Sequence, residues 1–221
     1  MKIFLSPSNQ DGNKYGYGNT TERDQCGKIA ESARAALERC GFEVMLMHDE
    51  DMETKVRAAN NWGADYYIPI HTNAFNGSVM GTRMFYYSEG EKGHQLTKAI
   101  FNRVAPLTPG TSENIKQNLG LYELKYPNAW TSYLEVEFHD SPEGAKWIIE
   151  HTKQIGEAIC QGICDHCGVT YKPEFSAAPA EPEKDKLYRV QVGAFRVKEN
   201  AEKLRDKLRS QGYSDAFVKE D

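Results

Sequence analysis

Three residues in separate parts of the chain are of types that bind metal ions or transfer protons. His71 follows the predominantly apolar run YYIPI, Glu22 follows the loop GYGNTT, and Glu135 lies within SYLEVEFHD. Imidazole and carboxylate groups are zinc ligands, and a carboxylate beside an activated water can act as a general base. Taken singly, His71 is typical of a hydrogen-bonded structural residue and Glu22 of a helix cap. Together the three predict an open metal site with a general base.

Apolar periodicity places each of these residues at a position that a fold can fix. His71 ends a predicted buried strand, and Glu22 opens a predicted helix, where the helix dipole favours the ionised carboxylate. In SYLEVEFHD, the strand period of two places Tyr133, Glu135, Glu137 and His139 on one face. Two glutamates and a histidine are costly to bury unless they meet a metal, another cation or a substrate. The alternative is a solvated sheet face.

Strands and helices alternate along the first 170 residues. We predict strands in KIFLS, FEVMLM, YYIPIH, GTRMFYYS, LGLYEL and TSYLEVEF, and helices in ERDQCGKIAESARAALERCG, DMETKVRAANNWGA, EKGHQLTKAIFNRVAP and PEGAKWIIEHTKQIGEAICQGIC. This order predicts an α/β fold, with a three-layer αβα domain over residues 1–170 built on a mostly parallel sheet. Functional residues are then expected at the carboxyl ends of the strands.

The composition changes beyond residue 170. Residues 171–185 are rich in Pro, Ala and Glu without an apolar period, which predicts a linker. Residues 186–221 predict a small β-α-β module. A unit of this size is too small to bury its apolar face alone, so we expect it to need a partner.

Bulk properties exclude several classes of protein. The net charge of -5 and the pI near 5.7 argue against a nucleic-acid-binding protein. No apolar run reaches the roughly 20 residues of a membrane span, and MKIFLSPS is too short for a signal peptide, so we expect synthesis in the cytoplasm and release by another route. The five cysteines are an odd set, which excludes a complete disulfide framework. Cys160 and Cys164 predict helix packing rather than a metal site.

Five segments, SPSNQ, GNTTE, RAANNWGADYYIPIHTNA, GTRMFYY and YLEVEF, occur in an order that resembles the amidase-3 family of zinc-dependent N-acetylmuramoyl-L-alanine amidases. The resemblance covers about residues 1–168. It implies one Zn²⁺ ion with Glu22 and His71 as ligands and Glu135 as the catalytic acid/base. The implied substrate is peptidoglycan of the bacterial cell wall. The implied reaction cleaves the amide between the lactyl group of N-acetylmuramic acid and L-alanine of the stem peptide.

The chain departs from this family at the first strand. The family motif Asp-Pro-Gly-His-Gly carries a further zinc ligand, whereas this chain reads SPSNQ, with Asn9 at the position of the His. We expect His139 to replace this zinc ligand. Gln10, or Asn9 through its side-chain oxygen, is the next candidate. Glu137 stands where the family commonly has Gly, and it is a candidate for substrate binding together with Asn73. Two alternatives stay open: a catalytically impaired wall-binding protein, and a metallopeptidase that cuts within the stem peptide.

The C-terminal segment is similar to the SPOR family of peptidoglycan-binding modules, through VQVGAF, then NAEKL in a helix, then GY. A full SPOR domain resembles two β-α-β halves, and this segment corresponds to one. The resemblance therefore implies either a truncated module or a homodimer in which two chains pair their half-repeats. Tyr188, Gln191 and Phe195 are candidates for glycan contact.

Overall fold

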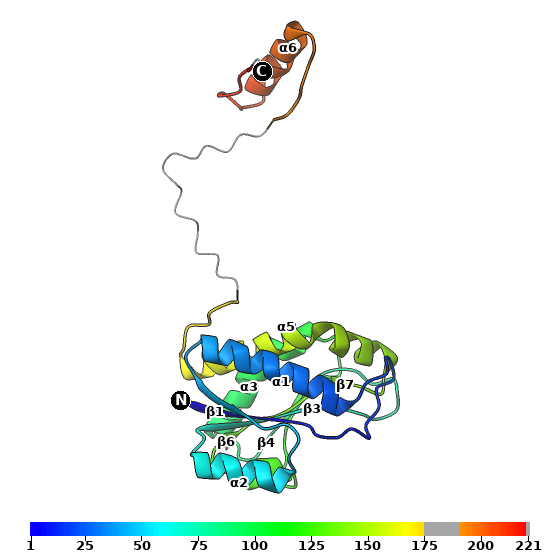
Figure 1. The fold of residues 1–221 in the computed structure, drawn as a ribbon, viewed down its shortest axis with the longest axis vertical. Helices are drawn as coiled ribbons and strands as arrows, with labels where there is room; N and C mark the ends of the chain where they lie inside the picture. Colours follow the sequence, from blue (N-terminus) through cyan, green and yellow to red (C-terminus); the bar gives the residue numbers. More distant parts are fainter. Residues whose placement is uncertain (175–190, 220–221) are drawn as a thin grey trace. The chain divides into compact units, whose positions relative to one another are not determined.

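A computed structural model of the chain describes residues 1–174 and 191–219. The chain divides into two compact units, Met1–Ser176 and Ala177–Asp221 (Figure 1). The first unit contains the sheet and all of the residues predicted to bind zinc.

The first unit is built on one sheet with the strand order β2-β1-β3-β7-β4-β5. These strands are β2 (Glu43–Leu46), β1 (Lys2–Pro7), β3 (Tyr66–Asn73), β7 (Tyr133–Phe138), β4 (Arg83–Tyr86) and β5 (Asn114–Gln117), and the short β6 (Trp130–Thr131) also pairs with β3. Every neighbouring pair is parallel except β4 and β7. The predicted mostly parallel sheet is confirmed.

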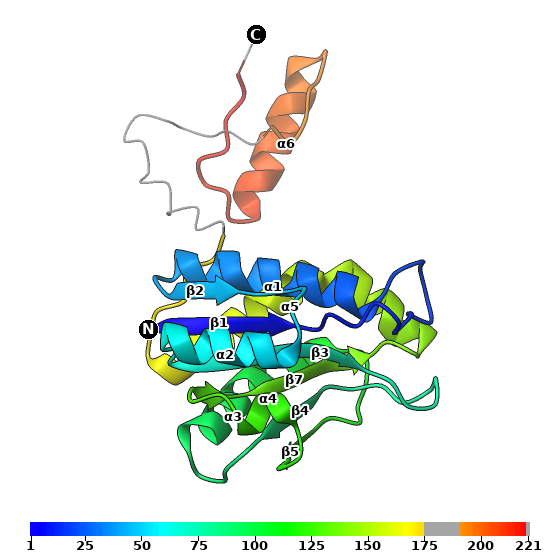
Figure 2. The same cartoon turned by 60° about the horizontal axis from the view of Figure 1, so that its bottom comes forward.

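Helices cover both faces of the sheet, as Figure 2 shows. On one face lie α1 (Glu22–Arg39), α3 (Lys92–Val104) and α5 (Pro142–Cys167), with a 3-10 turn (η1, Ala105–Leu107) after α3; on the other lie α2 (Met52–Trp62) and α4 (Tyr122–Lys125). The larger core packs α1, α3 and α5 on sheet residues such as Leu5 and Ile68, and the smaller one packs α2 on Phe4 and Tyr67. The predicted αβα layers are confirmed. Among the described residues, no helix combines the length and apolar character of a membrane span.

One predicted strand is wrong. LGLYEL contains part of α4 instead, and the strand at this edge of the sheet is β5, in a segment for which no strand was predicted. The side chain of Asn118 explains the change, because its Oδ1 accepts hydrogen bonds from the backbone N–H groups of Gly120 at 2.9 Å and Leu121 at 3.2 Å. An Asn that bonds the backbone two and three residues ahead forms a turn. The chain therefore leaves the sheet before Leu121 and enters α4.

The described part of the second unit, residues 191–219, contains one helix, α6 (Lys198–Ser210). No residue of α6 is buried, and Val192, Phe195 and Tyr213 beside it are exposed. The described residues on either side of α6 are not in strands. The first strand of the β-α-β module was predicted in LYRVQVGAF, and residues 187–190 of it lie outside the described residues. A helix of this amphipathic pattern without a buried face is consistent with a module that needs further surface to fold against.

Candidate functional site

Glu22 and His71 meet at the carboxyl ends of the central strands. Thr21 caps α1 in a capping box with Asp24, which makes Glu22 the first residue of the helix. His71 lies near the end of β3, and its Nδ1 is 2.9 Å from Oε1 of Glu22. Both side chains are buried. Two residues 49 positions apart are thus brought into direct contact, as the predicted site requires.

Glu135 lies on the neighbouring strand, where its Cα pairs in register with that of His71. The residue is half-buried, and its Oε2 is shielded from solvent without a hydrogen-bond partner among the described residues. Burial raises the pKa of Glu135 to about 7, although the positive charge of His71 lowers it. A carboxylate with a pKa near neutrality is suited to accept and return a proton.

A second carboxylate, which no sequence pattern singled out, contacts His71. Glu123 of α4 is buried, and its Oε2 is 3.4 Å from Nε2 of His71. Its Oε1 accepts hydrogen bonds from Ser6 Oγ at 2.5 Å and Tyr67 Oη at 2.7 Å. The one sequence feature that could have revealed it is an isolated Glu between Tyr and Leu in an apolar segment, which by itself predicts an exposed strand position.

The imidazole of His71 therefore lies between two carboxylates. Burial alone would lower the pKa of His71, but the hydrogen bonds with Glu123 and Glu22 raise it to about 10. Burial opposes ionisation of Glu22 and Glu123, yet their hydrogen bonds and charge interactions with His71 lower both pKa values. The three groups are thus stabilised in their ionised forms by one another. This is a compact charged cluster at the carboxyl ends of the central strands.

His139 lies close to this cluster but not within it. Its Nδ1 is 3.1 Å from the backbone oxygen of Thr72 and 3.0 Å from Thr72 Oγ1, and its ring stacks on Tyr15. Burial lowers the pKa of His139, which favours the neutral ring. A neutral imidazole that donates Nδ1–H to the carbonyl of Thr72 presents Nε2 as an unprotonated ligand atom.

Asn9 and Gln10 lie on the exposed side of the loop after β1. Asn9 Nδ2 donates to the backbone oxygen of Glu50 at 3.0 Å. Gln10 Oε1 accepts from Asn13 Nδ2, which also donates to Oε2 of Glu22 at 2.5 Å. Both residues are exposed. The loop thus positions Glu22 through Asn13 and turns the side chain of Asn9 toward Glu50.

The predicted alternation along β7 is interrupted after Glu135. His71 pairs with Glu135 but Asn73 pairs with Phe138, so β7 contains one extra residue at this point. Such a bulge re-aims the side chains that follow it. Glu137 is fully buried, and its Oε1 accepts from the N–H groups of Gly81 and Phe138 at 2.6 and 2.7 Å. Asn73, by contrast, is half-buried and its Oδ1 accepts from the N–H of Ala74.

The donor set of the site can be compared with the needs of a zinc ion. Glu22 and His71 offer a carboxylate and an imidazole, both accepted zinc ligands, and the buried Oε2 of Glu135 has no partner beside them. His139 is not close enough to complete a preformed triangle, because no three ligand atoms of His or acidic side chains among the described residues lie within 4.8 Å of one another. Glu22 and His71 are placed to bind one ion, and a third protein ligand such as His139 would have to move toward it.

Three cysteines do form such a triangle elsewhere. The sulfur atoms of Cys40, Cys160 and Cys164 lie within 4.8 Å of one another, so the group has the spacing of a metal site. Cys40, at the C-terminal end of α1, joins the two cysteines of α5. Burial raises the pKa of the Cys164 thiol to about 12 and that of Cys160 further. We interpret Cys160 and Cys164 as neutral thiols that pack with Cys40 in the core between α1 and α5.

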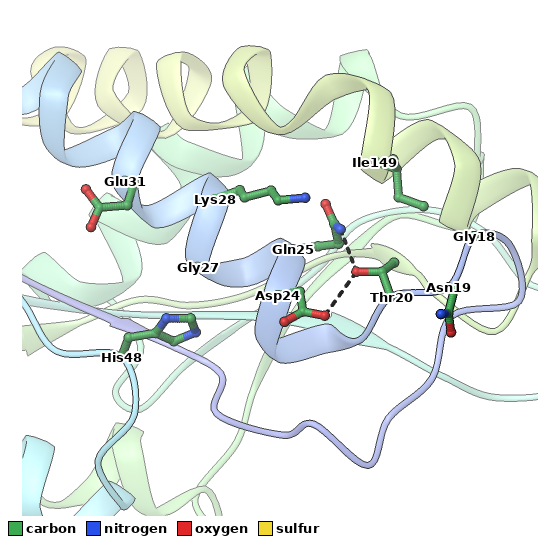
Figure 3. A pocket seen from close by; sticks show the side chains of 10 residues that line it. All are labelled: Gly18, Asn19, Thr20, Asp24, Gln25, Gly27, Lys28, Glu31, His48 and Ile149. Carbon is green, nitrogen blue, oxygen red and sulfur yellow. Dashed lines mark hydrogen bonds between the residues drawn. The ribbon is translucent and has the colours of Figure 1, made fainter.

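A surface cavity of about 840 Å³ lies along α1 (Figure 3). Its lining includes Thr20, Asp24, Gln25, Lys28 and His48, with Ile149 of α5. Figure 3 shows Gln25 donating to Thr20, which in turn donates to Asp24. The cavity is not lined by Glu22, His71 or Glu135, so it is separate from the charged cluster.

Comparisons with known proteins agree with this architecture. The sequence model described as N-acetylmuramoyl-L-alanine amidase matches residues 7–165, and that of the SPOR domain matches residues 175–221. The chain is 24% identical over its full length to the sporulation-specific N-acetylmuramoyl-L-alanine amidase of Bacillus subtilis, covering 86% of that protein. It is 23% identical to the germination-specific N-acetylmuramoyl-L-alanine amidase of the same organism, over 73% of this chain and 77% of that one.

Solved structures share the fold at low identity. The amidase AmiC2 of Nostoc punctiforme superposes with a TM-score of 0.69 at 20% identity, covering 76% of this chain and 97% of the other. The CwlD amidase of Clostridioides difficile, solved in complex with the GerS lipoprotein, gives 0.65 at 19% identity over 76% and 98% of the two chains.

Proposed function

This chain belongs to the N-acetylmuramoyl-L-alanine amidase family, and from that premise we propose that it is a zinc-dependent hydrolase of peptidoglycan. It cleaves the amide between N-acetylmuramic acid and L-alanine of the stem peptide. The observation that carries the proposal is the contact of His71 Nδ1 with Glu22 at 2.9 Å, with Glu135 in register beside it. Residues of α1, β3 and β7 lie close together at the carboxyl ends of the strands, where α/β folds place their active sites.

Glu22 and His71 would hold the single ion, and His139 would approach through Nε2 as the third ligand. When bound, the ion would polarise the scissile carbonyl and lower the pKa of the attacking water to about 7. Glu135 would accept a proton from the attacking water and return it to the amine nitrogen of L-alanine as the C–N bond breaks. Water is thus divided between the new carboxylic acid and the released amine. Asn73, near the end of β3, is our candidate for a hydrogen bond to the substrate, and Glu137 is retained as a second.

The reaction predicts specific products from purified cell wall. Incubating the protein with peptidoglycan and zinc is expected to release free stem peptides that begin with L-alanine, identified by mass spectrometry of the soluble fraction. Peptide fragments cut within the stem would instead identify a metallopeptidase. Binding to the wall without products would identify a non-catalytic wall protein.

The second part of the proposal is that the C-terminal module brings the enzyme to the bacterial cell wall, within domain limits of 1–170, 171–185 and 186–221. The match to the SPOR domain and the exposed Phe195 near α6 support this role, with Gln191 as a further glycan contact. Tyr188 lies outside the described residues. The lack of any buried residue in α6 supports pairing of half-repeats from two chains.

Removal of the module gives a direct test of this role. A protein ending at residue 176 is expected to retain activity on soluble muropeptides, because the first unit contains the whole charged cluster. Its co-sedimentation with insoluble peptidoglycan is expected to fall about tenfold or more, since linked modules raise the effective concentration of each other. Equal co-sedimentation of the two proteins would show that the module does not bind the wall. The mass of the full chain by light scattering tests the dimer.

A further inference from the structure

Both carboxylate oxygens of Glu123 have partners in the first unit. One oxygen accepts from the hydroxyls of Ser6 and Tyr67, and the other faces Nε2 of His71. These partners come from β1 and β3, whereas Glu123 comes from a four-residue helix on the opposite side of the sheet from α1. A separate element therefore brings a carboxylate to Nε2, the ring nitrogen of His71 that does not face Glu22.

The two ring nitrogens of His71 have different neighbours and can have different tasks. Nδ1 faces Glu22, the proposed zinc ligand, and Nε2 faces Glu123. A carboxylate that accepts the N–H on one side of an imidazole fixes the ring, keeps the other nitrogen unprotonated when a metal binds, and makes it a stronger donor. Lys55, whose Nζ donates to the backbone oxygen of Pro7 at 2.6 Å, adds a buried positive charge that interacts with Glu123.

We propose that Glu123 is a positioning residue for His71, and that its charge behind the ring compensates for the weak ligand position at Asn9. Asn9 donates to the backbone oxygen of Glu50 instead of facing Glu22 and His71, so the site has fewer preformed ligands than an ion with three protein ligands needs. A more basic His71 strengthens one of the remaining bonds. The inference rests on the proposed zinc function but assigns a role to a residue outside the ligand set.

Zinc affinity tests the inference directly. Glu123→Gln keeps the size of the side chain but removes its charge, and its single oxygen cannot serve both the hydroxyls and His71. We expect the zinc dissociation constant, measured by competition with a chromophoric chelator, to rise about 10- to 100-fold. Tyr67→Phe, which removes one hydrogen bond to Glu123 and leaves Oε2 in place, is expected to have a smaller effect.

Glu157→Gln is the matched control. Glu157 is a partly buried carboxylate that accepts from Arg39 and Tyr171, near the C-terminal end of α1. Because Glu22 begins this 18-residue helix, the control lies about 25 Å from the site. The control is expected to bind zinc as the wild type does. A general loss of stability in Glu123→Gln is recognised by thermal unfolding without metal.

A second measurement does not need zinc. In metal-free protein labelled with nitrogen-15, the Nε2 proton of His71 is expected to give a strongly downfield imidazole signal, assigned by its loss in His71→Gln. Glu123→Gln is expected to move this signal upfield, and Glu157→Gln is expected to leave it unchanged. An unmoved signal, or zinc affinity within twofold of the wild type, would overturn the role of Glu123. Failure of the wild type to bind zinc would instead overturn the proposed function, and the imidazole signal would still decide the contact.

Discussion

Glu135→Gln protein is expected to hydrolyse peptidoglycan about 10²- to 10⁴-fold more slowly than the wild type, because a neutral amide cannot accept the proton of the attacking water. Zinc binding is expected to persist, since Glu135 is outside the proposed ligand set and contacts neither Glu22 nor His71 through a hydrogen bond. The measurement is the initial rate of release of stem peptides, with metal content determined on the same preparation. Glu143→Gln, which changes an exposed glutamate in the first turn of α5, serves as the control.

The same substitution is expected to stabilise the metal-free fold. Burial raises the pKa of Glu135 to about 7 in the folded protein, whereas an unfolded glutamate titrates near 4.3. The folded state therefore binds this proton more tightly, and the resulting stability is present below about pH 4.3 and is lost as the pH rises through about 7. Glutamine does not ionise, so Glu135→Gln is expected to gain up to about 4 kcal/mol over the wild type at pH 8.

Urea unfolding in the presence of a chelator, at pH 5 and pH 8, measures this difference. The gain is expected to be larger at pH 8 than at pH 5. A variant that is less stable than the wild type at both values would show that the buried Oε2 of Glu135 makes a favourable contact as a carboxylate. Loss of catalysis together with a gain in stability is the result expected of a residue that is retained for chemistry.

The central part of the site was predictable from the sequence because it depends on element ends. An apolar strand that ends at His71 and an acid that opens a helix after a polar loop both have local patterns, and parallel strands bring their carboxyl ends to one edge. The strand containing Glu135 also had a clear apolar pattern. For these residues the periodicity predicts the element, and the fold class then predicts their proximity.

The contacts of Glu123 and Cys40 were not predictable in this way. Glu123 is in a short helix that the side chain of Asn118 initiates, and the apolar letters of LGLYEL favour a strand at this position. Its contact with His71 depends on how α4 packs on the sheet, which no local pattern specifies. Cys40 meets Cys160 across 120 positions of sequence for the same reason.

The orientation of the Glu137 side chain could not be predicted from the sequence, for a different reason. A period of two predicts that it shares a face with Glu135, and the prediction holds only while the strand is regular. The register shift opposite Asn73 adds one residue to β7, and no residue of SYLEVEFHD indicates where this extra residue is inserted. One oxygen of Glu137 is thereby bound to the N–H groups of Gly81 and Phe138, as a structural acceptor for the loop before β4.

Replacement of His71 by alanine is expected to have the largest combined effect on metal binding and stability. The variant loses the imidazole that contacts Glu22, so we expect no zinc to remain after dialysis against a weak chelator and activity to fall to the background rate. Metal content and the release of stem peptides are measured together. His151→Ala, which changes a half-buried histidine on α5, is expected to retain both. Zinc bound at a wild-type level in His71→Ala would remove this residue from the ligand set.

The stability of His71→Ala without metal depends on pH in a direction that the carboxylates determine. In the wild type, contact with His71 lowers the pKa values of Glu22 and Glu123, so their contribution is present above the unfolded pKa and is lost as the pH falls through the folded one. Without the imidazole these buried carboxylates have no cation between them, and breaking such a buried pair costs about 3–5 kcal/mol at neutral pH. The deficit is expected to shrink as the pH falls through the lowered pKa values of Glu22 and Glu123 in the folded wild type, because protonation removes their charge interaction with His71. Urea unfolding at pH 7 and pH 3 checks this, and a deficit that is equal at the two values would show that His71 stabilises the fold by packing on Tyr133 rather than by its charge.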